Sequence, residues 1–318
     1  MVKHRAFNKS YITKDSFVKL SHEDRLNDEI NYYHKIQSCD QKHLFAEFRG
    51  DKSNGLVYAL ELKNYENYKN IAEYFFNSDN KQHNCNLMRQ LMWMIDLLHT
   101  YPKSDIPHEF NGNVNDLNYQ MLVSKTINEY NSFLKSSDLF NELCSFDTLE
   151  INGVSYKNFS KISQDVFQII GEKYLNFDLS IIHGDCCFAN IMVNPAGSSL
   201  IFVDPRGSYG MKGIFGDKCY DYGKLLHSVS GNYEQIIYDM FNLTYSSNCI
   251  NFSFDKDLSY LKDVISKNLN TSTLVKSELI QGLIFIGMCA RHYDSVDRQI
   301  IMYCTGVKIL NEWLDAHK

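Results

Sequence analysis

The chain has 318 residues, enough for one large domain or two ordinary ones, since domains usually hold about 100–200 residues. Hydrophobic residues make up 44% and charged residues 22%, a balance typical of a globular protein that buries a substantial core. The 32 Lys and Arg against 38 Asp and Glu give a formal net charge of −6. This balance argues against a nucleic-acid-binding protein, because such proteins usually carry a basic patch.

Nothing in the sequence predicts export or membrane insertion. Residues 1–6 include basic side chains, but no apolar stretch of a signal peptide follows them. The longest apolar stretch, 279–290, is interrupted by Gln281 and Gly282 and falls short of the roughly 18 apolar residues that cross a bilayer. The nine cysteines are scattered without C-x-x-C spacing, so we expect reduced thiols in a cytoplasmic protein.

The first 62 residues read as a small, mostly β lobe. Short β-rich runs flank the polar turn Thr13-Lys14-Asp15. The sequence Ser21-His22-Glu23-Asp24 supplies a helix start, and apolar residues follow it at helical spacing. The pattern predicts one helix at 25–36 and strands at 10–12, 16–20, 44–48 and 56–62.

Helical periodicity dominates after residue 62, apart from one return to strands. Three short apolar runs joined by polar turns predict strands at 180–182, 191–193 and 200–203. Helices are expected at about 68–77, 85–100, 118–134, 161–176, 220–230, 257–267, 275–291 and 298–316. The sequence therefore predicts an α+β fold with a β-rich lobe over 1–62 and a larger, mainly helical lobe over 63–318. Ligands often bind where two such lobes meet.

Polar residues are grouped around the predicted strands at 180–203. His183, Asp185 and Asn190 form an H-x-D-x(4)-N string, and Asp204 follows the third strand. Phosphoryl transfer needs a carboxylate to orient and deprotonate the attacking hydroxyl, and oxygen ligands to hold Mg²⁺ against the nucleotide phosphates. Oxygen-bearing residues at adjacent strand ends would converge on one small volume, so the spacing indicates such a site.

Each of these residues also has a purely structural interpretation. Asp185 could cap a turn, Asn190 could adopt a left-handed turn conformation, and Asp204 could begin an Asp-Pro turn. All three on one strand–loop–strand framework favour the catalytic interpretation. His183 is expected to hold the loop through backbone hydrogen bonds rather than to contact substrate.

The motif as a whole resembles the signature of the aminoglycoside phosphotransferase and choline kinase family, small-molecule kinases with a bilobal, protein-kinase-like fold. The resemblance implies an enzyme that uses ATP and Mg²⁺, with Asp185 as the catalytic base and Asn190 and Asp204 as metal ligands. Arg206, two residues after Asp204, is a candidate contact to phosphate or substrate.

The N-terminal lobe offers the second part of a kinase site. Kinases place a Lys on a strand, where it contacts the nucleotide phosphates and pairs with a Glu on the next helix. Lys19 lies on a predicted strand, and Glu29 follows it on the predicted helix. The alternative for Lys19 is a solvent-facing strand lysine, and the rivals of Glu29 are Glu23, Asp24 and Asp28.

The nucleotide-covering loop departs from the family pattern. No G-x-G-x-x-G lies between the first two strands, so backbone amides or hydroxyls of Asn8, Ser10 or Thr13 would take its place. The resemblance further implies that Glu61-Leu62 is the hinge whose backbone recognises adenine, and an ordinary strand end is the alternative interpretation.

A glycine-rich loop follows Asp204. Its glycines recur at intervals of three, at Gly207, Gly210, Gly213 and Gly216. Such a loop needs positive φ angles or a close approach to a ligand. Its spacing is neither a Rossmann nor a P-loop fingerprint.

The function expected from the resemblance is transfer of a phosphoryl group from ATP to a hydroxyl of a small metabolite, such as a sugar or an amino alcohol. A narrower resemblance, carried by 204–207, 220–228 and 297–311, is to phosphotransferases encoded with bacterial capsule or surface-polysaccharide genes. A protein kinase is one alternative, although Gly184 stands where a protein kinase would carry Arg. A catalytically inactive nucleotide-binding scaffold is another, although Asp185, Asn190 and Asp204 are all present.

Overall fold

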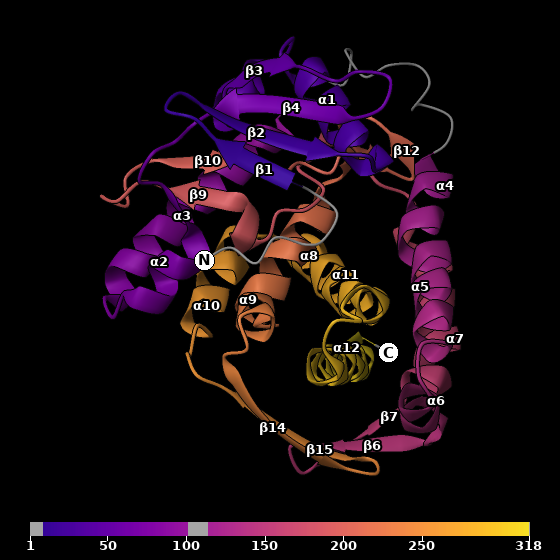
Figure 1. Ribbon diagram of the computed structural model, residues 1–318. Coiled ribbons are helices and arrows are strands. Elements are labelled where there is room, and N and C mark those ends of the chain that lie inside the picture. The colour runs from indigo at the N-terminus through magenta and orange to yellow at the C-terminus, as the bar shows by residue number, and fades with distance from the viewer. Residues whose placement is uncertain (1–8, 101–113, 318) are drawn as a thin grey trace. The chain divides into compact units, whose positions relative to one another are not determined.

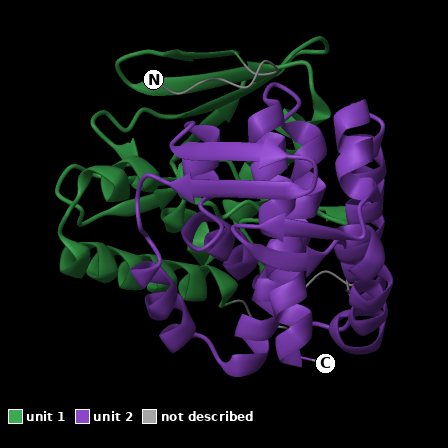
Figure 2. Ribbon diagram, turned by 90° about the horizontal axis from the view of Figure 1, so that it is seen from below, with its two compact units in different colours: residues 1–102, 180–216 green, residues 103–179, 217–318 purple. Residues whose placement is uncertain are grey.

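A computed structural model describes residues 9–100 and 114–317 of the chain. The chain divides into two compact units, one of residues 1–102 with 180–216 and the other of 103–179 with 217–318 (Figure 2). The first unit therefore combines the N-terminal segment with the segment that carries Asp185. The boundary at residue 62 rests on the change from a β-rich to a helical pattern in the sequence, and the division into a nucleotide-binding lobe and a catalytic lobe stays a prediction.

The first unit begins with an antiparallel four-stranded sheet in the order β1-β2-β4-β3 (Figure 1). Helix α1 (Asp24–Ile36) follows β2, and it buries Leu26, Ile30 and Tyr33 at helical spacing. The predicted β-β-α-β-β order is observed. The strands are β1 (Lys9–Ile12), β2 (Ser16–Ser21), β3 (Phe48–Asp51) and β4 (Tyr58–Lys63).

The strand predicted at 44–48 is wrong in position. A 3₁₀ helix (Asp40–Leu44) occupies the start of this stretch, and β3 begins only at Phe48. Phe45 is buried and forms a parallel bridge with Phe202, and the amide of Ala46 donates to the carbonyl of Phe202 over 2.9 Å. The apolar run therefore packs on the motif segment instead of extending the first sheet.

A second sheet of the first unit carries the motif segment. Its order is β10-β9-β5, with both pairs antiparallel, and helices α2 (Ile71–Asn77) and α3 (Lys81–His99) follow β5. The three strands predicted around the motif are observed to within one or two residues. The strands of this segment are β5 (Lys69–Asn70), β8 (Leu179–Ile181), β9 (Ile191–Val193), β10 (Leu200–Phe202), β11 (Ser208–Tyr209), β12 (Met211–Lys212) and β13 (Phe215–Asp217), with β8 paired to β13 and β11 to β12.

The second unit is mainly helical. Helices α8 (Lys218–Val229) and α12 (Val296–His317) both pack on α11 (Thr271–Met288). The stretch Thr271–Arg291 is long and apolar enough to cross a membrane, but 72% of its most apolar window is buried inside the protein, as expected of a core helix. The other helices are α4 (Val114–Asn118), α5 (Lys125–Leu134), α6 (Asp138–Ser145), α7 (Phe159–Ile169), α9 (Tyr233–Ile237) and α10 (Tyr260–Asn268), with π-helical turns at Tyr119–Ser124 and Ile170–Tyr174 and a 3₁₀ turn at Cys289–Arg291.

The second unit also contains a four-stranded sheet that the sequence analysis did not predict. Its order is β14-β15-β6-β7, and only the β15–β6 pair is parallel. The strands are β6 (Thr148–Ile151), β7 (Val154–Lys157), β14 (Phe241–Ser246) and β15 (Cys249–Phe254).

Candidate active site

Lys19 belongs to a partly enclosed charge cluster in the first unit. It lies on β2, across from Ser10 on β1 and Leu60 on β4. Only 12% of its side chain is exposed. The interpretation of Lys19 as a solvent-facing strand lysine is therefore wrong.

The ammonium of Lys19 joins two carboxylates that are far apart in sequence. Its Nζ donates to Glu29 Oε2 over 2.7 Å and to Asp204 Oδ1 over 2.5 Å. The Glu29 side chain is 6% exposed, whereas that of Asp204 is 49% exposed. The neighbouring acids have other partners: Tyr58 donates to Asp24 over 3.0 Å, and Asp28 pairs with Lys212 over 2.9 Å.

Each of these three groups shifts the pKa values of the other two. Burial raises the pKa of Glu29 to about 8, and the ammonium of Lys19 offsets only part of that rise. Burial alone would lower the pKa of Lys19, but Asp204 and Glu29 together raise it above its ordinary value. Partial desolvation would raise the pKa of Asp204, yet the ammonium of Lys19 holds it below its ordinary value. Asp204 therefore remains an anion at neutral pH.

His183 holds the loop that carries Asp185. Its Nδ1 accepts from the backbone amide of Asp185 over 3.2 Å, which makes Nε2 the donor to the carbonyl of Val203 at 2.9 Å. The ring is fully buried and stacks on Phe45 at 6.0 Å between ring centroids, with Phe202 edge-on to it. These contacts are those of a structural brace, as the sequence analysis expected for His183.

Asp185 and Asn190 are in direct contact. Asn190 Nδ2 donates to Asp185 Oδ2 over 3.1 Å and to the backbone carbonyl of Asp185 over 2.9 Å. The amide of Val203 donates to the carbonyl of Asn190 over 3.0 Å, which ties this loop to the residue before Asp204. The φ angle of Asp204 is 56°, in the left-handed region that non-glycine residues rarely adopt. Residues held in such conformations cluster at functional sites.

Of the remaining predicted nucleotide contacts, Ser10 is a cross-strand neighbour of Lys19, whereas Glu61 and Leu62 lie inside β4. Glu61 faces Val18 of β2, and Leu62 faces Phe17. Strand β4 also pairs with β3 on its other side, so backbone groups of both residues serve the sheet. Of the other two candidates for covering the phosphates, Asn8 lies outside the described residues, and the hydroxyl of Thr13 is hydrogen-bonded with the backbone of Ser16.

Mg²⁺ fits the donor chemistry of Asn190 and Asp204 when phosphates complete its shell. Among the described residues, no group of three or more His, Cys, Asp or Glu is arranged to hold a metal ion. Asp204 offers a half-exposed carboxylate and Asn190 an amide oxygen, both hard donors. Mg²⁺ usually takes one or two protein carboxylates and leaves the rest of its shell to waters and substrate phosphates. The pair therefore suits a Mg²⁺ ion that arrives with a nucleotide.

The fold is shared with solved phosphotransferase structures, although the sequence alone finds no relative. No protein-family model matches the chain, and no curated protein matches it. The GDP complex of aminoglycoside 2'-phosphotransferase IIIa aligns with 99% of this chain and 90% of its own, with a TM-score of 0.55 at 12% identity. The chain has the fold of this phosphotransferase. The predicted α+β, protein-kinase-like fold class is confirmed.

Two further structures share the fold. The ternary complex of APH(2'')-IIa with streptomycin and ATP covers 96% of this chain and 88% of its own, with a TM-score of 0.52 at 13% identity. A candidate fructosamine-3-kinase from Haemophilus somnus covers 98% and 92%, with a TM-score of 0.52 at 12% identity. At such identities the likeness establishes the fold, and the chemistry has to be argued from the residues of this chain.

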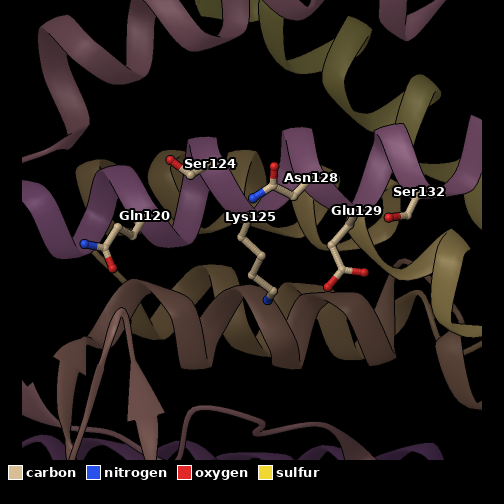
Figure 3. Close-up of a pocket in the computed structure, with 6 residues that line it drawn as sticks. All are labelled: Gln120, Ser124, Lys125, Asn128, Glu129 and Ser132. Carbon is tan, nitrogen blue, oxygen red and sulfur yellow. The ribbon is translucent and has the colours of Figure 1, made fainter.

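A separate polar cavity of about 580 Å³ lies along one face of the helix that contains α5 (Figure 3). Its two charged side chains are paired: Lys125 donates to the hydroxyl of Tyr220 over 3.2 Å, and Glu129 forms an ion pair with Arg291. No pattern in the sequence indicated a role for these residues. The cavity is lined by Gln120, Ser124, Lys125, Asn128, Glu129 and Ser132.

Proposed function

We propose that the protein is an ATP- and Mg²⁺-dependent kinase that transfers the γ-phosphoryl group to a hydroxyl of a small metabolite. The observation that carries the proposal is the direct contact of Lys19 with both Glu29 and Asp204. Asp185 is hydrogen-bonded to Asn190, and the carbonyl of Asn190 accepts from the amide of Val203, the residue before Asp204. A strand lysine, a helix glutamate and two loop acids in this connectivity are the parts that phosphoryl transfer requires.

Each residue of the cluster has one role in this proposal. Lys19 binds the nucleotide phosphates, and Glu29 holds its ammonium in place. Mg²⁺ held by Asn190 and Asp204 would neutralise negative charge on the phosphates. Asp185, oriented by Asn190, accepts the proton of the acceptor hydroxyl while the hydroxyl oxygen bonds to the γ-phosphorus. The bond from that phosphorus to the β–γ bridging oxygen breaks, and ADP leaves.

The nucleotide site is proposed to extend over the first sheet. Ser10 lies across from Lys19 and offers its hydroxyl to the phosphates. Glu61 and Leu62 belong to the strand that leads to the proposed adenine site. Because β4 is paired on both sides, we expect backbone recognition of adenine from the residues after Lys63.

The proposed acceptor is a small molecule. Streptomycin and ATP occupy one structure of the same fold, which supports a site built for a nucleotide and a small hydroxylated compound. The narrower resemblance to capsule-cluster phosphotransferases favours a precursor of a surface polysaccharide, so sugars and amino alcohols from such precursors belong in the first acceptor panel. We propose a cytoplasmic location, where ATP is available.

The test is a search for phosphorylated products. The purified protein is incubated with ATP, Mg²⁺ and a metabolite mixture, and products heavier by one phosphoryl group are sought by mass spectrometry. We expect at least one product with wild-type protein and a far lower yield of it with Asp185→Asn. Nucleotide binding without any product would support the inactive scaffold, and phosphoryl transfer only to added proteins would support a protein kinase.

A further inference from the structure

We propose that Gly207 is a positioning residue that fixes helix α1, and with it Glu29, against the loop that follows Asp204. The geometry stands by itself, and the catalytic consequence rests on the proposed kinase function. The glycine-rich loop has no phosphate-binding fingerprint, and its first glycine meets a helix backbone instead.

The Cα atom of Gly207 lies directly against the backbone of α1. A Cβ atom at this position would lie 2.0 Å from the carbonyl oxygen of Asp28 and 2.4 Å from its carbonyl carbon. Ordinary van der Waals contact begins at 3.4 Å, so any side chain would push the two backbones apart by more than an ångström. The atoms that such a Cβ would meet belong to the backbone of Asp28, so a change of side-chain rotamer cannot relieve the collision.

This contact joins the two chain segments whose carboxyl groups bind Lys19. Gly207 is three residues from Asp204, and Asp28 immediately precedes Glu29. Asp204 and Glu29 in turn both bind the ammonium of Lys19. The loop after Asp204 and helix α1 are therefore linked twice, through the ammonium of Lys19 and through the Gly207–Asp28 contact. The Gly207–Asp28 contact sets the distance between this loop and the helix that carries Glu29.

The loop that presents Gly207 is itself held in shape. The amide of Gly213 donates to the carbonyl of Gly207 over 2.9 Å, and β11 and β12 form a small hairpin between these two glycines. Tyr209 in this hairpin is fully buried. Lys212 at its end pairs with the side chain of Asp28 over 2.9 Å. The hairpin therefore meets α1 by a backbone contact and by an ion pair at the same residue.

A displacement of this size matters for the proposed chemistry. The Lys19–Glu29 contact is 2.7 Å long, and a shift of more than an ångström would break it. Misplacement of a catalytic arrangement by about 1 Å can lower turnover about 100-fold. We therefore expect Gly207→Ala to raise the KM for ATP, to lower kcat, or both, by a combined factor of about 10–100.

The matched control is Gly153→Ala. Gly153 has a φ of 78°, close to the 69° of Gly207, but a Cβ there meets nothing within 4 Å. Both variants therefore carry the same backbone penalty, and only Gly207→Ala carries the collision. Amide hydrogen exchange in α1 is measured for both. We expect faster exchange in α1 for Gly207→Ala and wild-type exchange there for Gly153→Ala.

A double-mutant cycle then tests whether the effect passes through Glu29. If it does, Gly207→Ala adds less than about two-fold to the ATP defect of Glu29→Ala, because the contact with Lys19 is already lost in Glu29→Ala. Fully additive defects would overturn the proposal, as would unchanged α1 exchange in folded Gly207→Ala. A Glu29→Ala variant with wild-type kinetics would instead contradict the proposed role of Glu29, while the exchange result would still decide the role of Gly207.

Should Gly207→Ala fail to fold, the wild-type protein supplies the test. Native-state exchange at increasing denaturant gives the opening free energy of the Gly213 amide, which donates to Gly207, and of the amides of α1. The proposal expects these amides to open together as one cooperative unit. Opening of the Gly213 amide while α1 stays protected would overturn it.

Discussion

Substituting Asp204 by Asn separates the metal-binding interpretation of this residue from the turn-forming one. Asn keeps the shape of the side chain and tolerates the φ of 56°, because Asp and Asn are the non-glycine residues that visit the left-handed region most readily. The substitution removes one negative charge 2.5 Å from the ammonium of Lys19. Backbone strain therefore stays nearly constant while the charge is lost.

The two interpretations predict different sizes of effect. The Asp204 side chain is 49% exposed, so solvent screens its ion pair with Lys19, and we expect the free energy of unfolding to fall by no more than about 1 kcal/mol. Loss of an outer-shell partner of a metal ligand typically costs about 10–100-fold, so loss of the charged ligand itself should cost at least about 100-fold in turnover. If Asp204 were only a turn former, Asp204→Asn would leave both turnover and stability nearly unchanged, because Asn forms the same turn.

Calorimetric titration of ATP with and without Mg²⁺ is the deciding assay. Wild-type protein should bind ATP more tightly when Mg²⁺ is present, and Asp204→Asn should lose that difference. Asp51→Asn is the charge-matched control, since Asp51 lies in the same unit and its ion partner is His34 at 3.8 Å. A wild-type Mg²⁺ response in folded Asp204→Asn would refute the metal assignment.

Three further substitutions test the rest of the cluster. Asp185→Asn should keep nucleotide binding and lower single-turnover rates by roughly 10²–10⁴-fold, the scale of a positioned general base, and unchanged rates would remove that role. Lys19→Met should impair ATP use and lower stability by about 1–3 kcal/mol, because the buried Glu29, held protonated up to about pH 8, loses the hydrogen bond from the ammonium. Adding Glu29→Gln should restore part of that stability but not ATP use, and recovery of both would make Lys19 purely structural. Because the folded protein holds a proton on Glu29 up to about pH 8 while the ordinary value is 4.5, wild-type stability should fall across this window as pH rises. Glu29→Gln should lack that fall in denaturant midpoints, and identical pH profiles would contradict the raised pKa.

Part of the arrangement of the candidate site residues could be predicted from the sequence, because their spacing is local. Asp185 and Asn190 are five residues apart on one loop, and the structure shows them hydrogen-bonded. Lys19 and Glu29 needed only the order of a strand followed by a helix. The contact of Lys19 with Asp204 joins residues 185 positions apart, and no pattern in the sequence indicates a contact over that separation. Only the resemblance to a kinase motif indicated it.

The errors have identifiable physical causes. Phe45 was placed in a strand because an apolar run looks the same whether it pairs with a sheet or packs on one. The β6–β7 hairpin had a readable signal, since Asn152-Gly153 lies between alternating apolar residues and both residues have positive φ. The hairpin of β14 and β15 had a weaker signal, because its turn, Ser247-Asn248, contains no glycine.

The protein-kinase alternative can be weighed against the packing around Gly184. This residue has a φ of 76°, and a Cβ on it would lie 2.8 Å from Cβ of Arg206, whose amide donates to the carbonyl of His183. An arginine at position 184, as in a protein kinase, would meet both a disfavoured backbone conformation and an occupied space. The side chain of Arg206 therefore leaves room only for glycine between His183 and Asp185. The loop that carries Asp185 and the loop that follows Asp204 are fitted to each other, and a change in one has to be matched in the other.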